Sequence, residues 1–262
     1  MENLEGRKLF ALAAPHFDHI VVVMEENRSY SQIIGNSAAP FINKLASHGA
    51  VFTRSFGLAH PSQPNYLGIF SGSVQGVTNN DCPVDFGGPS LGGELIGAGK
   101  TFIGYSEGLP AVGSKVCAGG GYVRKHNPWA DFADVPGEDN RPMSDFPARF
   151  GRLPAVSFVV PTSKHNMHNG SIGAGDLWLA SRLGKYATWA KRHNSLLIVT
   201  WDEDEGTAAN HIPTIFFGAH VRTGKYAQRI NHFHVLRVIE ESTSVGLLGE
   251  SGVVGQIKGV WI

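Results

Sequence analysis

Ser195-Leu-Leu-Ile-Val-Thr-Trp201 carries the strongest strand signal in the chain. A second run of the same kind, His19-Ile-Val-Val-Val-Met24, lies near the N-terminus. Continuous apolar and β-branched runs, without alternating polar residues, are typical of strands that are buried on both faces. The two runs therefore predict inner strands of a sheet that is covered by helices on each side.

Shorter strand and helix patterns alternate along the rest of the chain. Strands are predicted at residues 51–56, 101–105, 155–160 and 212–217. Helices are predicted at residues 39–48, 65–70, 176–192 and 231–241, with Asp176 as the N-cap of the third. This alternation predicts a single α/β domain over residues 1–262, with a mainly parallel central sheet and helices on both faces.

Two regions depart from the alternation. Residues 1–15 hold only a short apolar run after two basic residues, too short for a complete signal peptide, and we expect a disordered or processed segment there. Residues 113–154 are rich in Gly, Pro and Asp and predict a loop-rich excursion over the scaffold, and long loops of this kind are often functional. Its aromatic residues are predicted to be local core in preference to a pocket lining: Tyr122, Trp129 and Phe132.

The composition excludes several classes of protein. Of 262 residues, 42% are hydrophobic and 17% charged, which is typical of a globular protein. The net charge is zero and no basic run occurs, so a nucleic-acid partner is not expected. No stretch is long and apolar enough to predict an integral membrane segment.

Cys82 and Cys117 are the only cysteines in the chain. An even pair fits one disulfide in an oxidising compartment, which predicts a secreted or periplasmic protein, and two unrelated thiols are the alternative.

Acidic residues follow both inner strands at the point where each strand ends. The first strand leads into Glu25-Glu26-Asn27, and the second leads into the segment Asp202-Glu203-Asp204-Glu205. Ligands of such sheets bind outside the carboxyl ends of the strands. Because carboxylates packed together repel one another, a divalent cation is their natural partner. Solvated loops at the strand ends are the alternative for each cluster taken alone.

The segment His60-Pro-Ser-Gln-Pro-Asn-Tyr66 places a serine between two prolines, after a predicted strand and before a predicted helix. Pro64 suits the first turn of a helix, where a missing N–H costs nothing. Ser62 would then lie at the helix N-terminus, where N–H groups and the helix dipole favour an anion. A hydroxyl there is well placed to attack a phosphate, and an ordinary N-cap serine is the alternative.

Histidines also gather near the predicted strand ends. A lone histidine in a loop is usually a surface side chain, whereas several beside carboxylates indicate metal ligands or phosphate contacts. Spacing alone does not assign their individual roles. The candidates are His126, His165, His168, His211, His232 and His234.

In combination these motifs resemble the bacterial phosphoesterase family, which includes acid phosphatases and phosphatidylcholine-type phospholipases C within the alkaline-phosphatase-like superfamily. The resemblance runs from about His19 to Glu241 and implies an alkaline-phosphatase-like fold. It rests on the segments Glu26-Asn-Arg-Ser29, His60-Pro-Ser-Gln-Pro-Asn-Tyr66, Lys125-His-Asn-Pro-Trp129, Trp201-Asp-Glu203 and the helix at 231–240.

The resemblance implies metal-dependent hydrolysis of phosphate monoesters through a phosphoserine intermediate on Ser62. It implies a divalent metal ion, of unspecified identity and number, bound by Glu26, Asn27, Ser62, Asp202 and Glu203. It gives His126 or His211 the task of protonating the leaving group, and Lys125 and His168 contacts to the phosphoryl group. His60 is left as a structural residue behind the site. The expected substrate is a small phosphate ester or a phospholipid head group.

One departure concerns Asn166-Met-His-Asn169, where family members often carry aspartates in place of both asparagines. The two amides lower the local negative charge, which argues against a second metal site. Phospholipase C members also tend to be longer, so the length favours monoesters. The alternatives are a phospholipase C or other phosphodiesterase that uses the same residues and, more distantly, a metal-dependent binding module without turnover.

Overall fold

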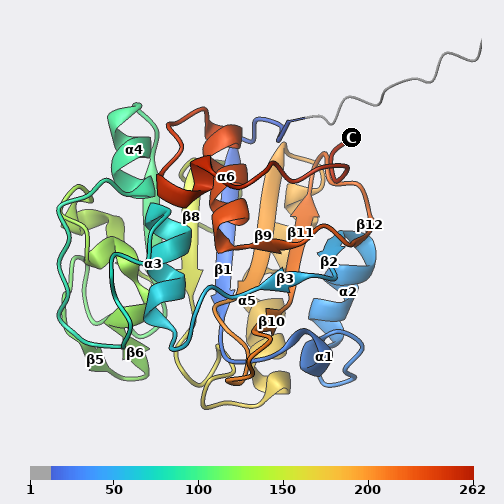
Figure 1. Ribbon diagram of the computed structural model, residues 1–262, viewed down its shortest axis with the longest axis horizontal. Coiled ribbons are helices and arrows are strands. Elements are labelled where there is room, and N and C mark those ends of the chain that lie inside the picture. The colour runs from blue at the N-terminus through green and yellow to red at the C-terminus, as the bar shows by residue number, and fades with distance from the viewer. Residues whose placement is uncertain (1–12) are drawn as a thin grey trace, which may run out of the picture.

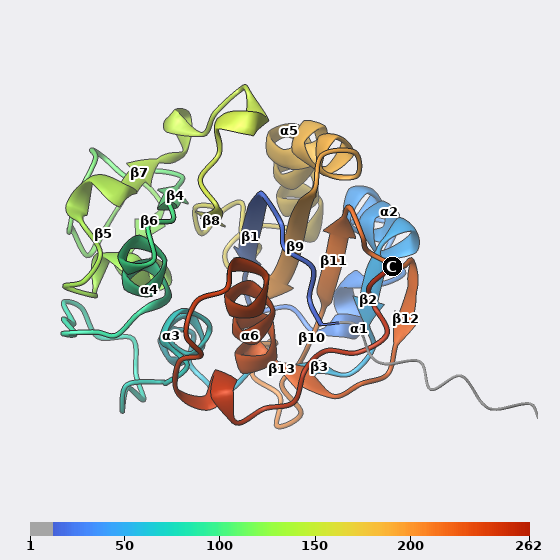
Figure 2. The same cartoon turned by 90° about the horizontal axis from the view of Figure 1, so that it is seen from above.

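An eight-stranded sheet forms the centre of the fold (Figures 1 and 2). The computed structural model describes residues 13–262, so most of the N-terminal segment predicted for residues 1–15 lies outside the described residues. In spatial order the strands are β12 (Gly224–Tyr226), β2 (Ala50–Phe52), β11 (Thr214–Gly218), β9 (Ser195–Trp201), β1 (His19–Glu25), β8 (Val156–Val160), β4 (Phe102–Ser106) and β7 (Asn140–Pro142).

The sheet is mainly parallel, as the continuous apolar runs predict. β1 lies between β9 and β8 and is parallel to both, and β4 is parallel to β8 and β7. β11 is antiparallel to β9 and β2. The segment between β9 and β11 holds no helix that could carry the chain back across the sheet, and a parallel pairing would need such a crossover.

Two predicted strands are each divided between the central sheet and a smaller one. The expected strand at 51–56 is β2 followed by β3 (Ser55–Phe56), and the one at 212–217 is β10 (His211–Ile212) followed by β11. Pro213 separates β10 from β11, because proline has no N–H to donate to a ladder. β10, β3 and β13 (Ile230–Asn231) form a three-stranded sheet, and β5 (Ala118–Gly119) pairs with β6 (Tyr122–Val123).

Helices cover both faces of the central sheet (Figure 2). The alternation of side chains along β1 divides the core, with Ile20, Val22 and Met24 in one apolar cluster and Val21 and Val23 in the other. The first cluster packs beneath α3 (Gln63–Ser71), α4 (Leu91–Gly97) and α6 (His232–Thr243). The second packs beneath α2 (Pro40–His48) and α5 (Ile172–Ala190), and the short α1 (Tyr30–Ile33) also contributes to it.

The prediction for the start of α5 is wrong, because the observed N-cap lies five residues before the predicted one, Asp176. Ser171 is the N-cap, and its hydroxyl accepts from the N–H of Ala174 at 3.2 Å. Asp176 lies inside the helix, where its carboxylate accepts from the N–H groups of Phe41 and Ile42 at 3.1 and 2.8 Å. Asp176 therefore caps the start of α2 and joins the two helices, which explains a buried carboxylate in this position.

The excursion at 113–154 is short strands and 3₁₀ turns joined by loops. Its aromatic residues Tyr122, Trp129 and Phe132 are buried, as predicted for local core. The predicted disulfide joins Cys82 to Cys117. Among residues 13–262 no helix is long and apolar enough to cross a membrane.

Candidate active site

Glu26 and Asp202 meet at the carboxyl edge of the sheet because the two strands before them end together. β1 and β9 pair along their whole length, with Glu25 opposite Trp201. The N–H of Asp202 then donates to the carbonyl of Glu25 at 3.0 Å, which extends the ladder by one residue. Both side chains are fully buried. The structure thus brings the two acidic clusters of the sequence together.

Ser62 joins this pair from the start of α3. It stands at the N-cap position, but within the described chain its side chain makes no capping hydrogen bond. The hydroxyl donates instead to Oε1 of Glu203 at 2.9 Å and lies 3.4 Å from Oε2 of Glu26. The simple N-cap interpretation is therefore wrong, because the hydroxyl faces the carboxylates and not its own helix.

Tyr66 is a further member of the site, which the sequence motifs do not single out. It lies one helical turn after Ser62 on the same face of α3, and its hydroxyl donates to Oε1 of Glu26. Its ring stacks on that of His126, with centroids 4.9 Å apart. The spacing of four residues from the serine is the signal that could have identified it.

His126 reaches the site from the excursion. Its Nε2 lies 3.1 Å from Oε1 of Glu26, and the ring is almost completely buried. Burial lowers the pKa of His126 well below its usual value, and the nearby charges of Lys125 and His168 lower it further. The imidazole is therefore neutral, and neither of its ring nitrogens has a hydrogen-bond partner among residues 13–262. The positive charge of Lys125 also lowers the pKa of Glu26.

His60 supports Glu203 from the side opposite Ser62. Its Nδ1 contacts Oε2 of Glu203, and its Nε2 lies 3.0 Å from the carbonyl oxygen of Thr207. Burial alone would lower the pKa of His60, but the hydrogen bond to the Glu203 carboxylate raises it overall. Ser62, Glu203 and His60 thus form a continuous chain of polar contacts.

Asn27 and Asp202 present unsatisfied oxygens to the same space. The backbone of Asn27 is left-handed, with φ of 50°, and its N–H donates to Oδ1 of Asp202 at 3.2 Å. Oδ1 of Asn27 and Oδ2 of Asp202 are buried and find no hydrogen-bond partner in residues 13–262. Buried polar atoms are rarely left unpaired, so this arrangement leaves room for a further partner.

The electrostatics of the carboxylates indicate what that partner is. Burial raises the pKa of Glu26 well above its usual value, and the charge of Asp202 raises it further. Burial and the neighbouring Glu203 raise the pKa of Asp202 to about 7. No group of three or more His, Cys, Asp or Glu side chains in the described part of the chain is arranged to hold a metal ion. The oxygen donors nevertheless fit a hard divalent cation. Such an ion would offset the repulsion between the buried carboxylates that contributes to their raised pKa values.

Two acidic residues of the same clusters point away from the site. Glu25 lies on the α5 side of the sheet, where burial, with Asp176 and Glu107, raises its pKa well above the usual value. Glu205 accepts from the N–H and the hydroxyl of Ser29 at 3.0 and 3.2 Å. The acidic clusters therefore divide between the site and the surrounding structure.

His168 and His211 do not touch Ser62. His168 is exposed, with its Nδ1 2.7 Å from Oδ1 of Asn169. The ring of His211 stacks between Tyr30 and Phe56, with centroids 4.9 and 5.2 Å away. Nε2 of His211 lies 3.0 Å from the carbonyl oxygen of Thr53. Both histidines therefore lie outside the group that contacts the serine.

Comparisons with known proteins concern the family and the fold. A family model described as "Phosphoesterase family" matches residues 36–246. A phosphatidylinositol-3-phosphatase of Mycobacterium tuberculosis is 50% identical over 256 residues, covering 97% of this chain and 86% of that protein. A phosphate-repressible acid phosphatase of Penicillium chrysogenum is 28% identical over 205 residues, which cover 72% of this chain but only 48% of the fungal protein.

A solved structure supports the fold assignment. It is a Vibrio parahaemolyticus protein in the alkaline phosphatase superfamily, with a TM-score of 0.64 and 12% identity. The match covers 94% of this chain and 72% of that one. The predicted alkaline-phosphatase-like fold is confirmed.

Proposed function

The chain belongs to the phosphoesterase family and is a phosphoric ester hydrolase, and from this premise we propose that it hydrolyses phosphate monoesters through a phosphoserine intermediate on Ser62. The observation that carries the proposal is the direction of the Ser62 hydroxyl. It is buried, leaves its helix uncapped and donates to Glu203 at 2.9 Å beside Glu26. A merely structural serine at a helix start would bond to the N–H groups of that helix.

We propose that a divalent metal ion binds beside this hydroxyl. The residues that would hold it are Glu26, Asn27, Ser62, Asp202 and Glu203. The unpartnered oxygens of Asn27 and Asp202 support this donor set. When bound, such an ion lowers the pKa of a hydroxyl and offsets negative charge on phosphoryl oxygens.

The chain's own residues would then perform two displacements at phosphorus. In the first, Oγ of Ser62 attacks, its proton passes to the Glu203 carboxylate, and the bond from phosphorus to the leaving oxygen breaks. In the second, water attacks the phosphoserine and releases inorganic phosphate and the free serine. His60 supports this by holding Glu203 in place. Lys125 and His168 are proposed to contact the phosphoryl oxygens. The charge of Lys125 lowers the pKa of Glu26.

The proton for the leaving group is assigned to His211 or His126, and their surroundings differ. His126 is buried and neutral, and its Nε2 lies 3.1 Å from Oε1 of Glu26, which suits a residue that positions the carboxylate. His211 is only half-buried and packs against two aromatic rings. We therefore propose His126 as a positioning residue, which leaves His211, outside the group that contacts Ser62, as the proposed donor.

Leaving-group dependence separates the two roles. For His126→Gln we expect kcat to fall about 10- to 100-fold with both p-nitrophenyl phosphate and phenyl phosphate, because Glu26 serves every substrate alike. For His211→Gln we expect a loss of about 10²-fold or more with phenyl phosphate and a much smaller loss with p-nitrophenyl phosphate, whose leaving group needs no proton. The opposite pattern would make His126 the acid.

The substrate class is proposed from the match to a phosphatidylinositol-3-phosphatase, whose name describes removal of a phosphate monoester from a lipid head group. We propose a phosphate monoester, either small or on a phospholipid head group. Turnover should be compared for p-nitrophenyl phosphate, bis(p-nitrophenyl) phosphate, phosphatidylinositol 3-phosphate and phosphatidylcholine. We expect the two monoesters to exceed the two diesters in kcat/KM by at least about tenfold. Preferential cleavage of either diester would establish the phospholipase C or phosphodiesterase alternative.

A secreted or periplasmic location is proposed from the disulfide between Cys82 and Cys117. Disulfides persist in oxidising compartments and are rare in reducing ones. Fractionation of cells that produce the full-length protein would test this location.

A further inference from the structure

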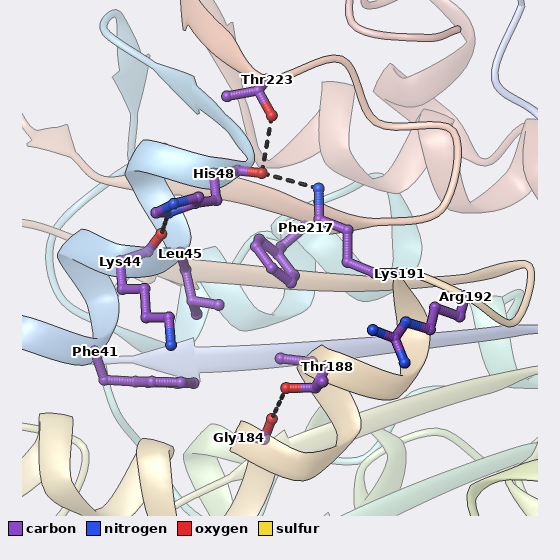
Figure 3. A pocket seen from close by; sticks show the side chains of 11 residues that line it. Phe41, Lys44, Leu45, His48, Gly184, Thr188, Lys191, Arg192, Phe217 and Thr223 are labelled. Carbon is purple, nitrogen blue, oxygen red and sulfur yellow. Dashed lines mark hydrogen bonds between the residues drawn. The ribbon is translucent and has the colours of Figure 1, made fainter.

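A hollow lies between α2 and α5 (Figure 3), on the face of the sheet opposite α3 and α6 (Figure 2). Its volume is about 490 Å³. Phe217 of β11 lines it and pairs with Leu197 near the start of β9. Asp202, in contrast, directly follows the end of β9. The hollow is therefore separate from the site around Ser62.

The floor of the hollow is apolar and is left open by a glycine. Phe41, Leu45, Ala187 and Phe217 supply the apolar surface. A Cβ on Gly184 would meet only the Phe41 ring, at 3.6 Å, which is ordinary contact. Because glycine is less favourable than alanine in a helix interior, neither helix stability nor lack of space accounts for it. Its effect is to leave the floor accessible.

The rim of the hollow carries positive charge without a balancing negative one. Lys44, His48, Lys191 and Arg192 line it together with two threonines, and no Asp or Glu does so. Among residues 13–262 no carboxylate forms an ion pair with any of these four side chains. Figure 3 shows Lys44, Lys191 and Arg192 arranged around the same space.

Of the cationic side chains on the rim, only Lys191 makes a contact within residues 13–262 that a purely structural role would explain. The ammonium of Lys191 donates to the carbonyl of His48 at 2.9 Å, at the end of α2, and lies 4.5 Å from the centroid of the Phe217 ring. Burial lowers the pKa of Lys191, which shows that its charge is partly desolvated. Lys44 and Arg192 are exposed and point to the hollow without such a bond.

We propose that this hollow binds an amphipathic anion, in which one carboxylate or phosphate-type head group is joined to an apolar chain. The head group would pair with Lys44, Lys191 and Arg192, and the apolar chain would cover Phe41 and Phe217. Charge complementarity decides the class of ligand: no acidic side chain lines the rim, its lysines and arginine are cationic, and the floor is apolar. A neutral apolar ligand would leave the cations unpaired, and a small inorganic anion would leave the floor exposed to water.

Isothermal titration calorimetry with matched probes tests the proposal. Octanoate and octylphosphonate carry both features, octan-1-ol only the chain, and acetate only the charge. We expect each amphipathic anion to bind at least tenfold more tightly than octan-1-ol or acetate. The two anionic probes distinguish a carboxylate from a phosphate-type head group. Binding of octan-1-ol as tight as that of octanoate would overturn the proposal.

Variants locate the binding. The double change Lys44→Gln with Arg192→Gln removes exposed charge, and Gly184→Leu fills the floor; each should weaken octanoate binding at least tenfold. Lys258→Gln, an exposed lysine elsewhere, should leave it unchanged. Hydrolysis of p-nitrophenyl phosphate should stay within about twofold in all three variants, since the hollow is remote from Ser62.

Two results would refute the proposal. Unchanged octanoate binding in the double variant would show that binding is nonspecific. A dimer in sedimentation that Gly184→Leu dissociates would show that a second copy of the chain covers the hollow.

Discussion

Ser62→Ala is expected to lower kcat for p-nitrophenyl phosphate by at least about 10³-fold, because it removes the atom that would form the phosphoserine. The hydroxyl donates to Glu203 at 2.9 Å and caps no helix, so its loss should not destabilise α3. Circular dichroism and the melting temperature should match those of the unchanged protein. Rapid acid quenching followed by mass spectrometry should find a phosphoryl group on Ser62 in the wild type and none in the variant.

Ser71→Ala is the matched control. Ser71 is a buried serine on the same helix, and its hydroxyl donates to the carbonyl of Leu67 at 2.9 Å, away from the carboxylates. We expect kcat to remain within about twofold of wild type in this variant. Turnover by Ser62→Ala that approaches the control would show that another group is the nucleophile.

The central sheet was predictable because its physical signal is local. The apolar runs that end at Met24 and Trp201 identify the two inner strands, and the acidic residues after them identify the carboxyl edge. Parallel pairing in register then brings Glu26 to Asp202 without further information. The division of one predicted strand into β2 and β3 was harder to predict. It depends on which sheet each part pairs with, and the β-propensity of the residues does not contain this information.

Within the site, the side of the sheet decides which acidic residue takes part. Along β1, Ile20, Val22 and Met24 face α3, so Glu26 continues that face and Glu25 the opposite one. This alternation was available in the sequence. The meeting of His126 with Glu26 was not, because it depends on how the excursion packs over the sheet. Long-range packing likewise holds His211 between two aromatic rings instead of beside Ser62.

Removal of the proposed metal ion is expected to lower activity strongly and to reverse the effect of Asp202 on stability. In protein treated with a chelator, we expect kcat to fall at least about 10²-fold and to return on addition of a divalent cation. Asp202→Asn should not regain activity at any cation concentration. Activity of the wild type that survives exhaustive chelation would contradict the metal proposal.

The same variant should be more stable than wild type while no metal is bound. The amide of Asn keeps an oxygen to accept from the N–H of Asn27 at the present 3.2 Å, and its NH₂ can face the Glu26 carboxylate in place of the unpartnered Oδ2. A buried charge is lost without an unsatisfied group being created. Since the pKa of Asp202 is raised to about 7 in the folded state, folding favours its protonated form. The stability of the chelated wild type should therefore fall as pH rises from about 4 towards 7.

The difference in unfolding free energy between variant and wild type should be small near pH 4 and reach roughly 2–4 kcal/mol above pH 7. Urea unfolding of both chelated proteins at pH 5 and pH 8 measures it. Added cation should then stabilise the wild type at pH 8, by mass action, and leave Asp202→Asn nearly unaffected. These measurements together distinguish a metal ligand from a structural aspartate. Loss of a structural aspartate would destabilise the protein at pH 8. Loss of a metal ligand instead stabilises the metal-free protein and abolishes its stabilisation by added metal.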